Sequence, residues 1–186
     1  MISIAFVAAL MLAVPGAPGS APNAAQLGPM AELLAGRVGR WCVEAHLRLR
    51  PEAPALSVAA TADGRFLGGR WLVTELHGMG FSGLGVNGYD PQRALYTGYW
   101  IDGTRGIPIP VEGRFDPATG IFRTVSRERG ADGRMIEVSS ETRRISPDEE
   151  ITRFTAPDGR GGRFERMVLR YRRAAPGAEC PARPAP

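Results

Sequence analysis

The sequence predicts an all-β protein, an antiparallel up-and-down barrel of about ten strands with a short helix at its N-terminus. Three observations lead to this prediction. About ten short segments alternate between apolar and polar residues, which is the period of a strand. The 24 glycines and 16 prolines fall mainly between those segments, as turn residues do. Strands do not alternate with helices, so a parallel sheet is not expected. A closed barrel is favoured because it leaves no unpaired strand edge.

Residues 29–36 predict the short helix. The segment begins with Pro and ends with Gly, which is where these residues commonly stand in helices. Met30, Leu33 and Leu34 would share one apolar face. A helix of this length is not stable alone, so we expect it to cover one end of the barrel.

Residues 38–50 show the strand alternation most clearly. The odd positions from 41 to 49 carry Trp, Val, Ala, Leu and Leu, whereas the even positions from 42 to 50 carry Cys, Glu, His, Arg and Arg. One face is therefore expected to point into the barrel and the other to solvent. Trp41 lies on the inner face in this interpretation, and Cys42 and His46 lie on the outer face.

Further strands are predicted over residues 56–62, 70–77, 94–102, 107–115, 121–127, 134–145, 150–156 and 164–173. Two turn signals follow the second strand, Asp63-Gly64 and Gly68-Gly69, and one of them is expected to be a bulge. Pro108 and Pro110 cannot donate to a strand ladder, so they predict a bulged or edge-like segment at a rim.

The first 25 residues predict an export signal. Residues 2–14 contain no charge and are almost wholly apolar, and small residues follow them. The alternative is an apolar N-terminal helix of the mature fold. The remaining chain divides into a barrel domain, residues 29–173, and a Pro/Ala-rich tail, residues 174–186. No later segment reaches the roughly 18 apolar residues of a membrane helix, so the mature chain is expected to be periplasmic or secreted, without a transmembrane segment.

The two cysteines agree with export. Cys42 lies on the first strand and Cys180 in the tail. In an oxidising compartment they are expected to form one disulfide, which would require the two ends of the domain to be neighbours. The alternative is two free thiols.

The charge distribution argues against a nucleic-acid partner. The formal net charge is +4, and all 23 basic residues are arginine. These arginines are scattered among acidic residues along the predicted strands and form no basic stripe. We expect a monomer or weak dimer with a soluble surface.

Gly39-Arg40-Trp41 at the start of the first long strand resembles the lipocalin signature. That resemblance implies that Trp41 closes the barrel floor and that an arginine of the last strand packs over it. Arg170, Arg172 and Arg173 are the candidates, and Arg173 is favoured because it is in phase with Tyr171.

A second resemblance covers roughly residues 33–173. The segments Leu67-Gly68-Gly69-Arg70-Trp71-Leu72, Gly88-Tyr89-Asp90-Pro91, Tyr99-Trp100-Ile101-Asp102 and Tyr171-Arg172 resemble a bacterial family of small exported proteins that is catalogued as a domain of unknown function. The resemblance implies a lipocalin-like (calycin) β-barrel and no established activity.

The glycine-rich residues 78–88 match the dinucleotide-binding fingerprint twice, as Gly78-x-Gly80-x-x-Gly83 and as Gly83-x-Gly85-x-x-Gly88. That fingerprint requires a following helix, whose N-terminus holds the pyrophosphate. A turn and another strand follow here instead. We therefore predict a glycine-rich strand or a flexible rim loop, and no nucleotide cofactor.

A metal site is considered and not favoured. Glu44 with His46, and Glu75 with His77, would make a two-His, two-carboxylate site if their faces met. The strand phase sends His46 outward, however, and a haem held by histidine would depend on the same two residues. The sequence also shows no nucleophile elbow, so no catalytic residue is assigned.

Three functions remain open. The first is binding of a small apolar or amphiphilic ligand inside the barrel, with Tyr99, Thr142 and Tyr171 as ligand-binding candidates. Candidates at the glycine-rich rim are Glu75, His77 and Asp102. The second is an envelope interaction or structural module whose barrel is filled. The third is a small-molecule enzyme, for which the same three rim residues are the only acid–base groups.

Overall fold

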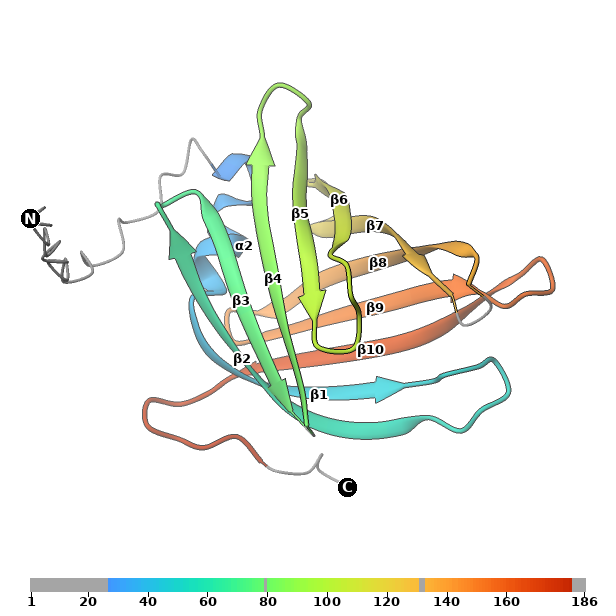
Figure 1. Cartoon of the computed structure of the whole chain (residues 1–186). Helices are drawn as coiled ribbons and strands as arrows, with labels where there is room; N and C mark the ends of the chain where they lie inside the picture. Colours follow the sequence, from blue (N-terminus) through green and yellow to red (C-terminus); the bar gives the residue numbers. More distant parts are fainter. Residues whose placement is uncertain (1–26, 79, 131–132, 182–186) are drawn as a thin grey trace, which may run out of the picture.

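The computed structural model describes residues 27–78, 80–130 and 133–181, and the predicted signal segment lies outside these residues. The described chain is an all-β closed barrel, as predicted (Figure 1). A 3-10 turn, η1 (Gly28–Met30), and a short helix, α2 (Ala31–Gly36), precede the strands. The strands are β1 (Gly39–Leu47), β2 (Leu56–Leu67), β3 (Trp71–Gly78), β4 (Phe81–Asp90), β5 (Leu95–Asp102), β6 (Ile109–Asp116), β7 (Ile121–Arg129), β8 (Met135–Ser146), β9 (Glu149–Pro157) and β10 (Arg163–Arg173).

Every strand pairs antiparallel with its neighbour in the chain, and β1 closes the ring by pairing with both β2 and β10 (Figure 1). The strands therefore run alternately up and down. One end of the barrel carries helix α2, and we call it the closed end. The other end carries the connections 48–55, 103–108 and 158–162, and we call it the open end.

The phase of β1 agrees with the alternation in the sequence. Trp41, Val43 and Ala45 are buried inside the barrel, and His46 lies on the outer face. The strand ends at Leu47, so Leu49 is 72% exposed in the following connection, although the alternation placed it on the apolar face.

The turn after β2 forms at Gly68 and Gly69, whose φ angles are +58° and +66°. Asp63-Gly64 forms neither a turn nor a bulge, because β2 runs through it in regular register with β3. Gly64 is needed there for space, since a Cβ atom would lie 2.1 Å from the Arg37 carbonyl oxygen. Gly64 is therefore explained by the close approach of β2 to the segment that follows helix α2, and not by a turn.

The prolines were predicted to mark a bulged or edge-like segment at a rim; β5 and β6 pair without a bulge, and Pro108 lies in the rim connection that precedes β6. Strand β6 begins at Ile109, and Pro110 pairs with Tyr99 in an unbroken register. Pro110 is exposed on the outer face. Register shifts occur instead in β10, between Glu165 and Met167, and in β8, between residues 144 and 146.

The N-terminal helix closes one end of the barrel because its apolar face packs inside the strand ends. The buried cluster there consists of Leu27, Met30, Leu33, Leu34, Leu72 and Tyr96. The Tyr96 hydroxyl fastens the turn to β5. It accepts a hydrogen bond from the Met30 N–H at 2.5 Å and donates one to the Leu27 carbonyl at 2.9 Å. Burial raises the pKa of Tyr96 to about 12.

Cys42 and Cys180 form the predicted disulfide, across 138 residues of sequence. The backbone N–H of Ala174 also donates to the Arg40 carbonyl at 3.0 Å. The start of the tail is thus fastened beside β1, at the closed end. The two ends of the domain are neighbours because β1 and β10 pair in the ring.

Candidate functional site

The floor of the barrel is built around Trp41. The Arg173 guanidinium lies over the indole, with its Cζ atom 4.4 Å from the ring centroid. Arg173 also donates to the carbonyls of Gly36 and Val38 and to Asp148. This arginine therefore joins the last strand to the segment between helix and β1, and its position over Trp41 adds a cation–π contact.

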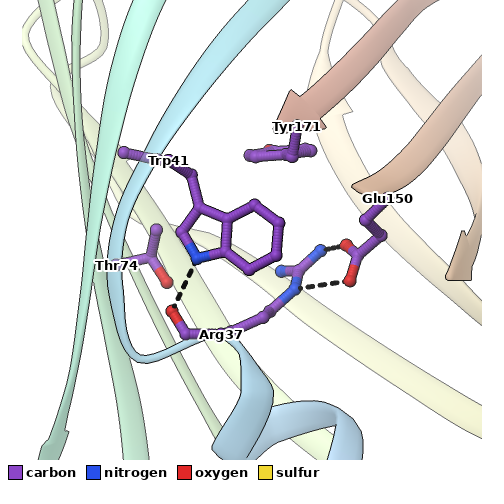
Figure 2. A pocket seen from close by; sticks show the side chains of 6 residues that line it. Arg37, Trp41, Thr74, Glu150 and Tyr171 are labelled. Carbon is purple, nitrogen blue, oxygen red and sulfur yellow. Dashed lines mark hydrogen bonds and ion pairs between the residues drawn. The ribbon is translucent and has the colours of Figure 1, made fainter. Parts of the chain in front are cut away.

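A buried ion pair lies beside the floor. Arg37, which follows helix α2, pairs with both carboxylate oxygens of Glu150 on β9 (Figure 2). Glu150 is 1% exposed, and Arg144 lies 3.8 Å from one of its oxygens. The Trp41 indole N–H donates to the Arg37 carbonyl at 3.2 Å. The arginines compensate a carboxylate that would otherwise be costly to bury.

These groups enclose a small pocket, with Thr74 and Tyr171 in its wall (Figure 2). The Thr74 hydroxyl is buried and has no partner within the described part of the chain. Burial raises the pKa of the Tyr171 phenol, although the nearby Arg37 opposes part of that rise. The pocket leaves about 10 Å³ for the centre of a water molecule, which is room for about one water. It is too small for an organic ligand.

The inward-facing side chains are less completely buried toward the open end than at the floor. Six inward-facing apolar side chains in the half nearer the open end stay only half-buried: Leu47, Val58, Leu76, Val111, Phe154 and Met167. In a filled interior these side chains would be buried like Val43 and Ala45. Five of the six pack against the buried cluster around Trp41, and the inward-facing Ile109, Val138 and Ala156 are buried. This part of the lumen is therefore partly accessible to solvent.

Hydroxyl groups line one side of the lumen. Thr124 on β7 bonds to Ser140 on β8 at 2.6 Å, and Thr142 on β8 bonds to Thr152 on β9 at 2.9 Å. These strands are neighbours, so the two pairs form a row on one wall. The inner wall of β7–β9 consequently combines these hydroxyls, three of them buried, with the apolar side chains of Phe122 and Phe154.

The glycine-rich segment is a strand, β4, and its glycines make room for two tryptophans. A Cβ atom on Gly83 would lie 2.2 Å from the Trp100 ring, inside the barrel. A Cβ atom on Gly88 would lie 2.5 Å from the Trp71 ring, on the outer face. The alternating glycines therefore let one indole lie flat on each face of β4. The tryptophans therefore explain Gly83 and Gly88, whereas Gly78 lies against Ala60 and Gly80 has a φ of +74°.

A network of charges spans the open end. Glu128 on β7 is 8% exposed and pairs through one oxygen with Arg105, from the β5–β6 connection. Its other oxygen pairs with Arg166 on β10 at 3.0 Å. Asp102 accepts hydrogen bonds from the Trp100 indole at 2.8 Å and from Thr104, and Arg105 lies 3.6 Å away. These contacts join β5, β7 and β10 across the mouth.

Asp102 is held in its charged form. Burial acts to raise the pKa of its carboxyl, but the hydrogen bonds from Thr104 and Trp100 and the charge of Arg105 outweigh burial and lower it. A carboxylate stabilised in this way orients its neighbours and is a poor proton donor at neutral pH.

Residues 26–173 match the family described as "Protein of unknown function (DUF1579)". The chain belongs to this family. Among solved structures, the DUF1579 barrel is similar to the crystal structure of Rv2717c from M. tuberculosis, with a TM-score of 0.58 and 13% sequence identity. That similarity covers 80% of this chain and 99% of the other, and it supports the fold alone. No curated protein matches the chain.

The three ligand-binding candidates of this DUF1579 chain lie on different faces of the barrel. Thr142 faces the lumen in the hydroxyl row, and Tyr171 faces inward beside the floor. Tyr99 is 53% exposed on the outer face, so its assignment to the interior is wrong. The aromatic pattern of β5 misled the assignment, because Tyr96 and Trp100 occupy the inward phase.

The three rim candidates are separated as well. Glu75 and His77 lie on the outer face of β3, where Glu75 contacts Arg65 and His77 is 54% exposed. Only Asp102 points inward. The strand phase therefore places Glu75 and His77 on the opposite face of the sheet from Asp102, so these three residues do not form one acid–base group.

The two histidines do not converge. His46 contacts Glu44 and Ser57 on the outside of β1 and β2, whereas His77 lies on β3. No group of three metal-ligating side chains occurs among residues 27–78, 80–130 and 133–181.

In that same part of the chain, no helix combines the length and the apolar character that a membrane crossing would require.

Sequence reasoning missed the inward charges. Glu150 is the first residue of the predicted strand 150–156 and was given no role, although it stands two residues before Thr152 and four before Phe154 on the same face of β9. Glu128 fell just beyond the predicted end of β7. A predicted strand longer than 121–127 would have put Glu128 in the inward phase, and the alternation within 150–156 already put Glu150 there.

Proposed function

We propose that this protein is exported to the periplasm or secreted and that it binds a small apolar or amphiphilic molecule in the lumen. The ligand enters through the open end. Export is supported by the apolar, uncharged residues 2–14 and by the Cys42–Cys180 disulfide, since disulfides persist in oxidising compartments.

The observation that carries the proposal is the half-buried state of inward-facing apolar residues near the open end. Apolar groups that are accessible inside a barrel can be covered by an apolar ligand, with a gain of roughly 25 cal/mol per Å² buried. The hydroxyl row and the guanidiniums of Arg105 and Arg166 supply polar groups that can orient such a ligand.

Two matched variants test the proposal. Ala60 faces the lumen beside Val43, and the next residue, Ala59, faces outward beside Glu44. Ala60→Phe should fill the lumen and weaken binding of a fluorescent amphiphile, such as 1-anilinonaphthalene-8-sulfonate, at least tenfold. Ala59→Phe should leave the binding unchanged. Native mass spectrometry of protein purified without detergent should also find a bound small molecule.

A second function is favoured by one observation on the outer face. Tyr99 and Ile101 are exposed on β5, and they pair with Val86 and Leu84 on β4. This apolar surface suits an envelope interaction module. If no amphiphile binds and Ala60→Phe behaves like Ala59→Phe, the lumen proposal is contradicted and the outer surface becomes the site to examine.

A further inference from the structure

The two walls of the lumen differ in polarity, and this difference follows the strands. In the closed ring of ten strands, β7 lies opposite β2 and β8 lies opposite β3. The inner face of β2 and β3 presents Val58, Ala60, Ala62 and Leu76, with Thr74 as its polar exception. The inner face of β7–β9 carries the hydroxyl row between apolar side chains, Phe122, Val138 and Phe154. The lumen therefore has hydroxyl groups on one side, of which Ser140, Thr142 and Thr152 are buried, and almost none on the other.

The hydroxyl row has unused hydrogen-bonding capacity. Each hydroxyl carries one donor and two acceptor sites, and one bond between two hydroxyls uses only one of their two protons. Thr142 and Thr152 make only their mutual bond with the described part of the chain, and so do Thr124 and Ser140. Each pair thus keeps one O–H group without a protein acceptor, which is unfavourable in a buried position.

The spacing of the two pairs defines what would satisfy them. Ser140 and Thr142 stand two residues apart on β8, so their side chains are separated by roughly 6–7 Å along the strand. A ligand matching this wall would carry two polar groups at about that spacing on one side, and an apolar surface on the other. A straight-chain amphiphile, with its polar group at one end only, would not match.

We infer that the ligand of this barrel is a flat, two-faced amphiphile, a rigid ring system with hydroxyl or carbonyl groups along one face. That face lies on Thr124, Ser140, Thr142 and Thr152, and the apolar face lies on β2 and β3. This inference rests on the proposed function, and it adds the class of ligand and its orientation.

Three carboxylate probes of different shape test the inference. Cholate carries three hydroxyls on one face of its ring system, lithocholate carries one on the same skeleton, and laurate is a straight chain. All three offer the same group to Arg105 and Arg166. Calorimetry should give cholate an affinity at least fivefold above that of lithocholate, and tenfold above that of laurate.

The chain offers a matched pair of double variants. Thr142→Val/Thr152→Val removes the inner pair, and because both partners become apolar with little change in shape, the fold is retained. Ser139→Ala/Thr155→Val removes a pair at 2.8 Å on the same two strands, on the outer face. The inner variant should weaken cholate binding about fivefold to tenfold and leave laurate binding within twofold, and the outer variant should change neither. Ser140→Ala should act in the same direction as the inner variant.

The outcomes separate the two proposals. If none of the probes binds, lumen binding itself is overturned. If laurate binds as tightly as cholate, or if the inner variants leave cholate binding unchanged, the two-faced ligand is overturned while binding in the lumen stands.

Discussion

The two ends of this barrel each hold an inward carboxylate between two arginines, but in different surroundings. At the closed end, Glu150 is 1% exposed and its partners Arg37 and Arg144 are 24% and 22% exposed. At the open end, Glu128 is 8% exposed, and Arg105 and Arg166 are 31% and 34% exposed.

The difference lies in what surrounds the charges. The closed-end carboxylate is packed among Trp41, Tyr171 and the helix, and the pocket beside it has room for about one water. The open-end carboxylate is tied to a connection between strands, next to half-buried apolar residues. The charged groups at the closed end are thus enclosed by packed side chains, whereas those at the open end remain more exposed to solvent.

The largest effect is expected from the disulfide at the closed end. Cys42→Ser/Cys180→Ser should lower the free energy of unfolding by about 5 kcal/mol, because the bridge closes a loop of 138 residues in the unfolded chain. Urea unfolding monitored by tryptophan fluorescence measures this loss. Binding of the fluorescent amphiphile at the open end should persist while the variant is folded. An unchanged unfolding midpoint would contradict a stabilising role for this bridge.

A matched pair of carboxylate variants tests the comparison directly. Glu150→Gln should lower the free energy of unfolding by about 3–5 kcal/mol, because Arg37 and Arg144 lose the charge that compensates them in a buried site. Glu128→Gln should cost about 1 kcal/mol, because Arg105 and Arg166 remain partly solvated. Equal losses in urea unfolding would show that the two ends do not differ in this way.

A further effect concerns the attachment of the helix. Tyr96→Phe should cost about 1–3 kcal/mol, because the buried Met30 N–H and Leu27 carbonyl both lose their partner. The raised pKa also predicts a pH dependence. The Tyr96 phenol has a pKa of about 12 in the folded state and about 10 unfolded, so its stabilisation is complete below pH 10 and is lost as the pH rises through 12.

Urea midpoints at pH 8, 9.5 and 11 check this prediction. The wild-type protein should lose more stability than Tyr96→Phe between pH 9.5 and 11. If the two proteins lost the same amount, the hydroxyl would not be the group that titrates.

Much of the fold could be predicted from local patterns. The alternation in β1 placed Trp41 inside and Cys42 outside, because side chains of a strand alternate strictly between its two faces. The prediction failed for Tyr99, because aromatic residues occur on both the inner and the outer face of a strand, so the residue type does not indicate which face it occupies. The turn signal at Asp63-Gly64 was misleading for another reason: Gly64 packs closely against the Arg37 carbonyl, and the turn lies four residues later.

The sequence by itself determined the class, the approximate strand number and the partner of Cys42, because these depend on periodicity, turn residues and a cysteine count of two. Only the tertiary structure decided that Glu128 meets Arg166 across the mouth and that Glu150 meets Arg37 at the floor. These partners are 38 and 113 residues apart, and their contact depends on the register and curvature of strands around a closed ring. The tertiary structure also explains Gly83 of β4, because the Trp100 indole of the neighbouring strand lies on it and leaves no room for a Cβ atom.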